Sequence, residues 1–354
     1  MMVIGVDPHK QTHTAVAVDE LGRKQAQQTV QARRDGHQAL IGWARAAAPQ
    51  QRCWAVEDVR HVAGNLIRDL LAAGERVVFV PPRLMAGARR GGRERGKSDP
   101  IDALAIARAA QREGDDLPAG QLDEVTRPVR QLADYRDVLV KDRTAMISRL
   151  RWQLHDLDPA LAPAQGTLNR AVTRRRLAAA LAALPASTGQ QIALSLLARI
   201  TSLSQEITAL EHQLAALVTP LAPALLAIPG VSVLTAARLL GETGDIRRFR
   251  TSAAFARHNG TAPIPVSSGT PAAEGPHRLN RAGNRQLNAA LHRVSLTQAR
   301  CHPPAQAYLN HRTTTRRETP KATRRAHKRH LSDTIYHAMT TDARHRDTTQ
   351  PPTT

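Results

Sequence analysis

The sequence predicts an α/β domain followed by a mainly α-helical remainder. Two observations support this expectation. Short β-branched runs alternate with helix-spaced apolar residues in the first third of the chain, and helical spacing dominates from about residue 128 onward. A third observation bears on function: 50 Lys and Arg residues stand against 30 Asp and Glu residues, a net charge of +20. A surplus of this size favours a polyanionic partner such as nucleic acid and disfavours acidic small molecules.

Length and composition limit the class of protein. A chain of 354 residues is long enough for two or three domains, and 42% hydrophobic residues argue against wholesale disorder. The two cysteines, Cys53 and Cys301, are too few for a disulfide framework or a thiolate metal site. Since no apolar run reaches the roughly 18 residues of a membrane span, we expect a soluble, cytoplasmic protein.

The first domain is expected over residues 1–115. The runs Val3–Val6 and Thr14–Val18 predict two strands, and the turn that follows at residues 19–22 favours antiparallel neighbours. A third strand is predicted to end at Glu57, a helix lies between residues 64 and 74, and a further strand covers residues 77–80. This order of elements is typical of an α/β domain.

A glycine- and arginine-rich stretch follows at residues 85–97, with the sequence MAGARRGGRERGK. It has no apolar period, so we expect a mobile basic loop that contacts nucleic acid. The candidate contacts are Arg89, Arg90, Arg93, Arg95 and Lys97. A helix should begin after it, with Ser98 or Asp99 as N-cap and Pro100 near the first position.

Residues 116–222 are expected to form long helices. Apolar residues in the second helix recur at near-heptad spacing: Leu194, Leu197, Ile200, Leu203, Ile207, Leu210, Leu214 and Leu217. The matching positions of the first helix are Leu132, Tyr135, Leu139, Met146, Leu150 and Leu154. An intramolecular helical hairpin and an intermolecular coiled coil that holds a dimer both fit this pattern. Arg174, Arg175 and Arg176 are candidates for phosphate contact, although a solvated charge run has the same appearance.

Two further segments complete the chain, at residues 223–310 and 311–354. The first opens with a Pro229-Gly230 turn that resembles half of a helix-hairpin-helix motif, with Ser232 in place of the usual second glycine. Such a turn can present backbone N–H groups to a phosphate, and a plain helix start is equally compatible. The last segment is strongly basic between Arg312 and Arg329 and is typical of a nucleic-acid-binding arm.

Four carboxylates occupy positions that suggest a metal site. Asp7 and Glu57 end predicted strands, whereas Asp99 and Asp102 are spaced i, i+3 on one helical face. Two Mg²⁺ ions held by such a set can act together on a phosphodiester. Each acid alone is more often a turn or cap residue, and only the combination indicates the site. Asp58 is an alternative ligand, although strand alternation turns it to the opposite face.

Several of these motifs together resemble a known family. The runs IGVDPHKQTHTAVAVDELG, AVEDVRHVAG and RGKSDPIDALAIAR look like the Asp-Glu-Asp-Asp catalytic domain of the Piv-like transposases of bacterial insertion sequences, the group numbered one hundred and ten. IPGVSVLTAARLLGETGDIRRF, HNGTAPIPVSSGT and HRLNRAGNRQLNAALH look like its C-terminal transposase domain. The resemblance implies a RuvC-like, ribonuclease-H-type fold for the first domain. One departure is the loop after Glu57, which lacks the family's Thr-Gly or Ser-Gly pair.

The resemblance also implies a serine nucleophile that forms a covalent phosphoserine with DNA. The motif here is Ser267-Ser268-Gly269; its first position matches Ser267, and Ser268 is the alternative. Asn284 is suited to cap the following helix, and Arg281 or Arg285 to hold a phosphate. His9 and His13 are candidates for proton transfer, with an exposed hairpin surface as their default position.

The implied function is that of a Mg²⁺-dependent DNA recombinase of an insertion sequence. The family implies a structured noncoding guide RNA, which bridges element and target DNA, and a nucleoid-associated bacterial protein. Strand exchange handles four DNA ends, so a homodimer or homotetramer is expected. Alternatives are a RuvC-like junction-resolving nuclease that uses water, and a non-catalytic DNA-binding inversion factor. A sugar-kinase-like ATPase is disfavoured by the charge and by the lack of a glycine-rich phosphate loop.

Overall fold

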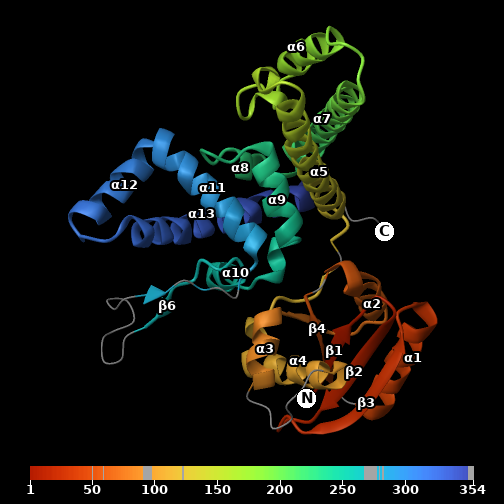
Figure 1. Ribbon diagram of the computed structural model, residues 1–354. Coiled ribbons are helices and arrows are strands. Elements are labelled where there is room, and N and C mark those ends of the chain that lie inside the picture. Colours follow the sequence, from red (N-terminus) through yellow and green to blue (C-terminus); the bar gives the residue numbers. More distant parts are fainter. Residues whose placement is uncertain are drawn as a thin grey trace. The chain divides into compact units, whose positions relative to one another are not determined.

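The computed structural model describes residues 1–49, 51–58, 60–90, 98–121, 123–266, 277–278, 280 and 283–349 (Figure 1). The chain folds into two compact units. The first comprises Met1–Glu124, Ala227–Gly230 and Glu242–Thr354, and the second comprises Val125–Leu226 and Val231–Gly241. Each unit has hydrophobic clusters of its own.

A five-stranded sheet forms the N-terminal part of the first unit. Its strands are β1 (Met2–Pro8), β2 (Thr12–Val18), β3 (Lys24–Gln31), β4 (Arg52–Glu57) and β5 (Val77–Val80), in the order β3-β2-β1-β4-β5. β1 pairs antiparallel with β2 and parallel with β4, while β4 and β5 are parallel. The predicted strands and the antiparallel β1–β2 pair are therefore confirmed.

β3 was not predicted, because its sequence lacks the usual signal. The strand reads KQAQQTVQ and is largely exposed at the edge of the sheet. Edge strands commonly carry polar and charged residues, which discourage pairing with another chain. β3 is held by pairing with β2 and by Ala26 and Val30, which pack into the hydrophobic cluster beneath α1.

Side chains alternate between the two faces of the sheet, and each face has its own helical cover. Ile4, Val6, Trp54 and Val56 pack with helices α1 (Arg34–Ala47) and α2 (Arg60–Ala72). Val3, Cys53 and Ala55 point the other way, toward α3 (Pro82–Arg90) and α4 (Asp99–Glu113). This arrangement follows from the two-residue period of a strand buried on both faces.

The basic stretch departs from the expected loop at its beginning. Residues 85–90 continue α3, so Arg89 and Arg90 have helical backbone and the expectation of a loop is wrong there. Leu84, Met85 and Ala88 pack against the hydrophobic cluster beneath the sheet, which explains the helix. Arg93, Arg95 and Lys97 lie outside the described residues.

The second unit is built on two long antiparallel helices, α5 (Arg127–Leu157) and α7 (Thr188–Leu221) (Figure 1). Tyr135 donates a hydrogen bond to Glu206, Arg143 to Ser204, and Gly189 lies against Leu157, so the two helices run in opposite directions. The short helix α6 (Ala171–Ala182) completes a leucine-rich cluster with them. An intramolecular helical hairpin is therefore present, and the intermolecular coiled coil stays a prediction.

Five of the predicted seam residues on α7 are buried, namely Leu197, Ile200, Ile207, Leu210 and Leu214. Tyr135 on α5 is instead 47% exposed and reaches Glu206 through its hydroxyl. The remaining short helices are η1 (Gly114–Asp116), η2 (Pro159–Leu161), η3 (Thr167–Asn169), α8 (Pro223–Leu226) and η4 (Ile246–Arg248).

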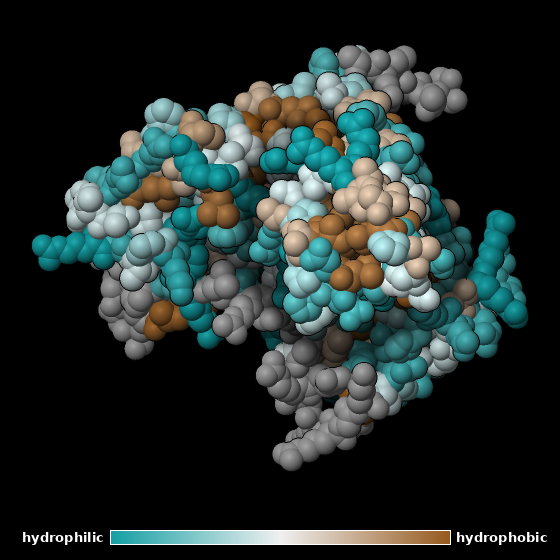
Figure 2. All heavy atoms as spheres, turned by 45° about the horizontal axis from the view of Figure 1, so that its top comes forward, coloured by the Kyte–Doolittle hydropathy of each residue, from teal (hydrophilic) through white to brown (hydrophobic). Residues whose placement is uncertain are grey.

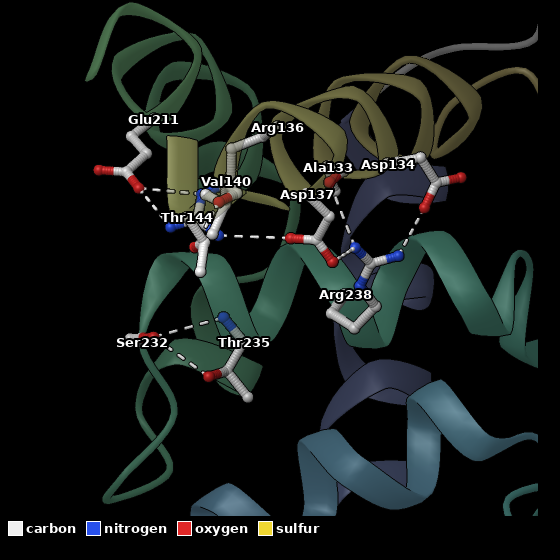
Figure 3. Close-up of polar contacts among 10 residues, drawn as sticks. All are labelled: Ala133, Asp134, Arg136, Asp137, Val140, Thr144, Glu211, Ser232, Thr235 and Arg238. Carbon is white, nitrogen blue, oxygen red and sulfur yellow. Dashed lines mark hydrogen bonds and ion pairs between the residues drawn. The ribbon is translucent and has the colours of Figure 1, made fainter. Parts of the chain in front are cut away.

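Helix α9 (Val233–Thr243) begins at the predicted Pro-Gly turn. Gly230 has a φ of +85°, and the Ser232 hydroxyl accepts a hydrogen bond from the Thr235 backbone N–H at 3.3 Å (Figure 3). This contact uses one of the free N–H groups of the first turn. Phosphate contact at this turn stays a prediction.

An ionic cluster anchors α9 to α5 within the second unit. The buried Arg238 guanidinium donates to Asp134 and to Asp137, each at 2.6 Å, and to the Ala133 carbonyl oxygen (Figure 3). Arg136 joins Asp137 to Glu211 on α7. Three elements of the unit are thus connected by charge-assisted hydrogen bonds.

The C-terminal part of the first unit is helical, with α10 (Ser252–His258), α11 (Arg285–Cys301), α12 (Pro303–Thr314) and α13 (Pro320–Thr349). A short antiparallel pair, β6 (Ile264–Pro265) and β7 (His277–Arg278), precedes α11. Residues 320–349 of the expected basic arm form α13, which packs on α10, α11 and α12 (Figure 1). Its buried residues Leu331, Ile335, Met339 and Ala343 recur every four positions, so this basic segment is also an amphipathic helix.

Among the described residues, no helix combines the length and the apolar character that a membrane span requires. The face of the molecule in Figure 2 carries hydrophobic patches set among hydrophilic side chains.

Candidate active site

A close approach between β1 and α4 positions the predicted carboxylates. A Cβ atom on Gly5 would lie 2.1 Å from the Ala103 carbonyl oxygen and 2.5 Å from the Ala107 backbone nitrogen. Only glycine permits this contact, because real Cβ atoms keep clear of backbone by 3 Å or more. The first turn of α4 is thereby held next to the end of β1.

Asp7 and Glu57 lie at the same edge of the sheet. β1 and β4 are parallel with Val6 opposite Val56, so the residues that follow are adjacent at the carboxyl ends of these strands. Asp7 is buried and Glu57 is half-buried. The role of these two acids as metal ligands stays a prediction.

Asp99 and Asp102 occupy the first turn of α4, after Ser98 at the N-cap position. Asp102 is 7% exposed, whereas the Asp99 side chain is 46% exposed. Carboxylates in the first helical turn interact favourably with the positive end of the helix dipole. Because Asp102 directly precedes Ala103, whose carbonyl oxygen lies against Gly5, it is held near the end of β1 that carries Asp7.

His9, a candidate for proton transfer in the sequence, contacts two of the acids. Its Nε2 atom lies 3.3 Å from Asp7 Oδ2 and 3.2 Å from Asp99 Oδ1, so it joins the strand acid to the helix acid. One ligand atom from each of Asp7, His9 and Asp99 falls within 4.8 Å of the others. The signal in the sequence was its position two residues after Asp7, just past the strand end.

Burial and mutual repulsion change the acidity of the cluster. Burial raises the pKa of Asp7, and the Asp102 and Asp99 charges add to this effect while His9 opposes it. Burial also raises the pKa of Glu57, again with help from Asp7 and Asp102. Negative charges that destabilise one another in this way are offset when a cation binds between them.

The donor set fits a divalent cation. Carboxylate oxygens are the ligands that Mg²⁺ and other hard cations prefer, and imidazole suits several transition metals. Asp7, Glu57, Asp99 and Asp102 supply hard donors from two strand ends and one helix, and His9 adds a nitrogen.

His13 does not lie on a hairpin surface, so that default expectation is wrong. It is 1% exposed and stacks on His37 with ring centroids 5.2 Å apart, while His37 Nδ1 lies 2.6 Å from Asp69 Oδ2. Burial and the His37 charge lower the pKa of His13 to about 4. Strand alternation explains the burial, because β2 is covered on both faces.

The C-terminal candidates are described only in part. Ser267, Ser268 and Arg281 lie outside the described residues, between and after strands β6 and β7. Asn284 caps α11, since its Oδ1 accepts from the Gln286 and Leu287 backbone N–H groups, as predicted. Arg285 is exposed at the first position of the same helix.

The three predicted arginines of α6 have different environments. Arg174 is buried and donates to the Leu168 and Asn169 carbonyl oxygens, so its guanidinium holds the preceding turn of the chain. Arg175 and Arg176 are exposed. Nucleic-acid contact stays a prediction for this group, and the geometry favours the latter two.

Comparisons with known proteins agree with this geometry. Residues 4–159 match a family model described as Transposase, of the DEDD type, and residues 222–310 match the Transposase IS116/IS110/IS902 family. The chain is 29% identical over 329 residues to the uncharacterized 44.8 kDa protein of insertion element IS116 from Streptomyces clavuligerus, covering 78% of this chain and 80% of that protein.

Two further relatives extend the comparison. An uncharacterized 42 kDa protein of insertion element IS900 from Mycobacterium paratuberculosis is 28% identical, over 82% of this chain and 85% of its own length. A probable family 20 transposase from Pseudomonas aeruginosa is 27% identical, over 66% and 68%. Since the two family matches together span more than half of the 354 residues, the chain belongs to the IS110 family of DEDD transposases and is an insertion-sequence transposase that acts on DNA.

Proposed function

We propose that this transposase is a Mg²⁺-dependent recombinase that cleaves and exchanges DNA strands through a serine nucleophile. The observation that supports it most is that ligand atoms of Asp7, His9 and Asp99 lie within 4.8 Å of one another, with Glu57 at the end of the neighbouring strand and Asp102 in the first turn of α4. The strand order, with three antiparallel and then parallel strands, supports a RuvC-like, ribonuclease-H-type fold for the first domain.

Asp7, Glu57, Asp99 and Asp102 would hold the divalent cations, and two Mg²⁺ ions fit the number of carboxylates. When bound, the cations supply electrostatic stabilisation for the negative charge that develops on the reacting phosphate. Because Asp7 and Asp102 are buried, water would screen their attraction for a cation less than at the surface.

Ser267 is the proposed nucleophile, with Ser268 as the alternative. In the proposed step the serine Oγ forms a bond to the phosphorus, the bond from phosphorus to one ribose oxygen breaks, and that DNA end leaves as a free hydroxyl. A base takes the serine proton, and the departing ribose oxygen gains a proton as it becomes a hydroxyl. His9, beside Asp7 and Asp99, is the candidate for this proton transfer. Attack by the freed hydroxyl of another strand reverses the step and joins new ends.

Guidance by a structured noncoding RNA and assembly into a homodimer or homotetramer complete the proposal. The +20 net charge and the exposed Arg175 and Arg176 support contact with nucleic acid. Exposed apolar side chains on α5 and α7 support self-association: Val138, Trp152, Ile192 and Leu217, with Trp152 77% exposed. Such an enzyme would be associated with the nucleoid of a bacterial cell.

The test uses the full chain, purified with the RNA that it retains, and DNA that carries element ends and a target. Asp102→Asn should abolish strand cleavage because a ligand is lost, whereas Asp35→Asn, an exposed acid on α1, should leave it unchanged. Equal activity of the Asp102 variant and the parent would overturn the assignment of the carboxylate cluster.

A further inference from the structure

A cavity lies among the C-terminal helices, and none of the four carboxylates is among its described lining residues. It is a cavity of about 610 Å³, walled by residues 260–263, by strand β7 and by helices α12 and α13 with the turn between them. Positively charged residues dominate its lining. Glu318 is the only acid among the described lining residues, and it faces six cations: Arg278, Arg312, Arg316, Arg325, Lys328 and Arg329.

Part of this charge is neutralised within the fold and part is not. Arg312 forms an ion pair with Glu318 at 2.5 Å, and Arg329 pairs with Asp333 at 2.5 Å. Within the described part of the chain, no ion pair of Arg316 or Arg325 is found. A concave surface with a surplus of one charge concentrates the field and attracts an anion.

Lys328 is a buried cation in the wall of this cavity. It is 7% exposed, and its Nζ donates at 2.7 Å to the side-chain oxygen of Asn288, a neutral acceptor. Burial lowers the pKa of Lys328, and the nearby Arg325 charge lowers it further. A buried ammonium without a carboxylate partner costs free energy, which a bound anion would recover.

A buried polar frame holds this lysine in place. Asn288 donates through Nδ2 to the Asn259 carbonyl oxygen at 2.9 Å, and the Asn259 side chain donates to Ser332 Oγ at 2.8 Å. The segments around Gly260 and Gly283 are also in direct backbone contact, because a Cβ atom on Gly283 would lie 2.1 Å from the Gly260 backbone nitrogen. The cavity wall is therefore organised before any ligand arrives, which lowers the entropic cost of binding.

The dimensions and one aromatic side chain indicate the kind of anion. A volume near 610 Å³ lies within the range of sites for small ligands, and it suits one or two nucleotides better than a duplex. Tyr308 contributes a half-buried ring to the wall, beside His330 at a centroid distance of 4.9 Å. Aromatic rings and arginines at one site are typical of single-strand binding, where bases stack and phosphates are paired.

We propose that this cavity binds a nucleotide of a single DNA strand, with its backbone phosphates held by Arg316, Arg325 and Lys328. β7 lines the cavity and pairs with β6, and in the sequence Ser267 follows Pro265 of β6 by two residues. The choice of DNA rests on the proposed serine chemistry. The bound nucleotide would then belong to the strand that the serine attacks.

The test is fluorescence anisotropy with a 5′-labelled ten-nucleotide oligo-dT, in EDTA so that no strand is cut. Arg316→Ala with Arg325→Ala should weaken binding more than tenfold, and the salt dependence should fall by about 1.4 in slope, since two phosphate contacts are lost. The matched control is Arg293→Ala with Arg300→Ala, which removes the same charge from exposed positions on α11 outside the cavity. This control should change the affinity for the oligonucleotide by less than threefold.

One further variant and two further ligands complete the test. Lys328→Met should melt no lower than the parent and yet bind the oligonucleotide more weakly, because it removes a buried charge that serves the ligand. Oligo-rU should bind no more tightly than oligo-dT, and millimolar inorganic phosphate should compete only weakly. Equal losses in the arginine double variant and its control, normal DNA binding by Lys328→Met, or binding confined to RNA or to free phosphate would each overturn the proposal.

The same assay separates this proposal from the serine mechanism. Ser267→Ala with Ser268→Ala removes the proposed nucleophile and should leave anisotropy unchanged. If the serine mechanism fails while the cavity variants still lose DNA binding, the cavity stands as a DNA site. If adducts form normally on the arginine double variant and its binding is unaffected, the cavity assignment fails alone.

Discussion

Gly5 on β1 and Ala103 on α4 are in backbone contact, and this contact determines where the carboxylates of the helix meet those of the sheet. A Cβ atom at residue 5 would stand 2.1 Å from the Ala103 carbonyl oxygen. The next residue of α4 toward its N-terminus is Asp102, which is buried at the strand end beside Asp7. A glycine without any polar atom is thus one of the residues that assemble the candidate site.

Gly5→Ala should therefore lower stability by about 1–3 kcal/mol, the usual cost of overpacking, because α4 must move away from the sheet. Metal-dependent cleavage should fall with it. Gly42→Ala is the matched control, since Gly42 is exposed in the middle of α1 with nothing within 4 Å of the added Cβ. That variant should be as stable as the parent or more so. Urea denaturation compares the two, and equal stability of Gly5→Ala and the parent would contradict the packing account.

Asp7→Asn should separate metal binding from folding. Without a cation, removing one of several mutually repelling acids should keep or raise the melting temperature, since burial and neighbouring charges already raise the pKa of Asp7. With Mg²⁺, the parent should gain stability and the variant should gain little. Thermal melts with EDTA and with Mg²⁺ provide the comparison. A Mg²⁺ response of equal size in both proteins would remove Asp7 from the metal site.

Arg238→Ala should destabilise the second unit by about 2 kcal/mol, because Asp134 and Asp137, although partly exposed, lose a buried partner that donates to both at 2.6 Å. Arg247→Ala is the control, since Arg247 pairs with Asp245 and Asp347 at a half-exposed position and should cost less than about 1 kcal/mol. Chemical denaturation followed by circular dichroism measures both. Similar small costs for the two variants would show that the Arg238 cluster contributes little.

His13 should make stability depend on pH. Its pKa is about 4 in the folded protein and near 6.5 when unfolded, so the unfolded chain binds the proton first as pH falls. The contribution is fully present above pH 6.5 and is lost toward pH 4, with a slope of at most about 1.4 kcal/mol per pH unit. His13→Gln should flatten this dependence, whereas His155→Gln, at an exposed site, should not. Unchanged pH profiles for His13→Gln would contradict a buried neutral histidine.

The sheet and its acids were largely predictable because their signals are local. Val3–Val6, Thr14–Val18 and Val77–Val80 are β-branched runs; Asp7 directly follows the first, and Glu57 ends the apolar strand β4. β3 was missed because its inward positions, Ala26, Gln28 and Val30, give a weak apolar signal, and α3 because its contacts are tertiary. The bridging position of His9 depends on how β1 and α4 meet, which spacing along the chain does not encode.

The basic C-terminal segment illustrates a different limit. Its Lys and Arg density was visible in the sequence, but so dense a charge run obscured the apolar positions Leu331, Ile335 and Met339 that bury one side of α13. Only the fold shows that Lys328 is buried and lines a cavity.

In the proposed mechanism, the carboxylate cluster serves a serine nucleophile. The most direct measurement is mass spectrometry of the protein after reaction with DNA and Mg²⁺, with peptides mapped for a covalently attached nucleotide. We predict an adduct on Ser267 in the parent, and neither adduct nor cleavage for Ser267→Ala with Ser268→Ala. Cleavage by that double variant at the parent's rate, with no adduct on either serine of the parent, would contradict the account and favour a nuclease that uses water.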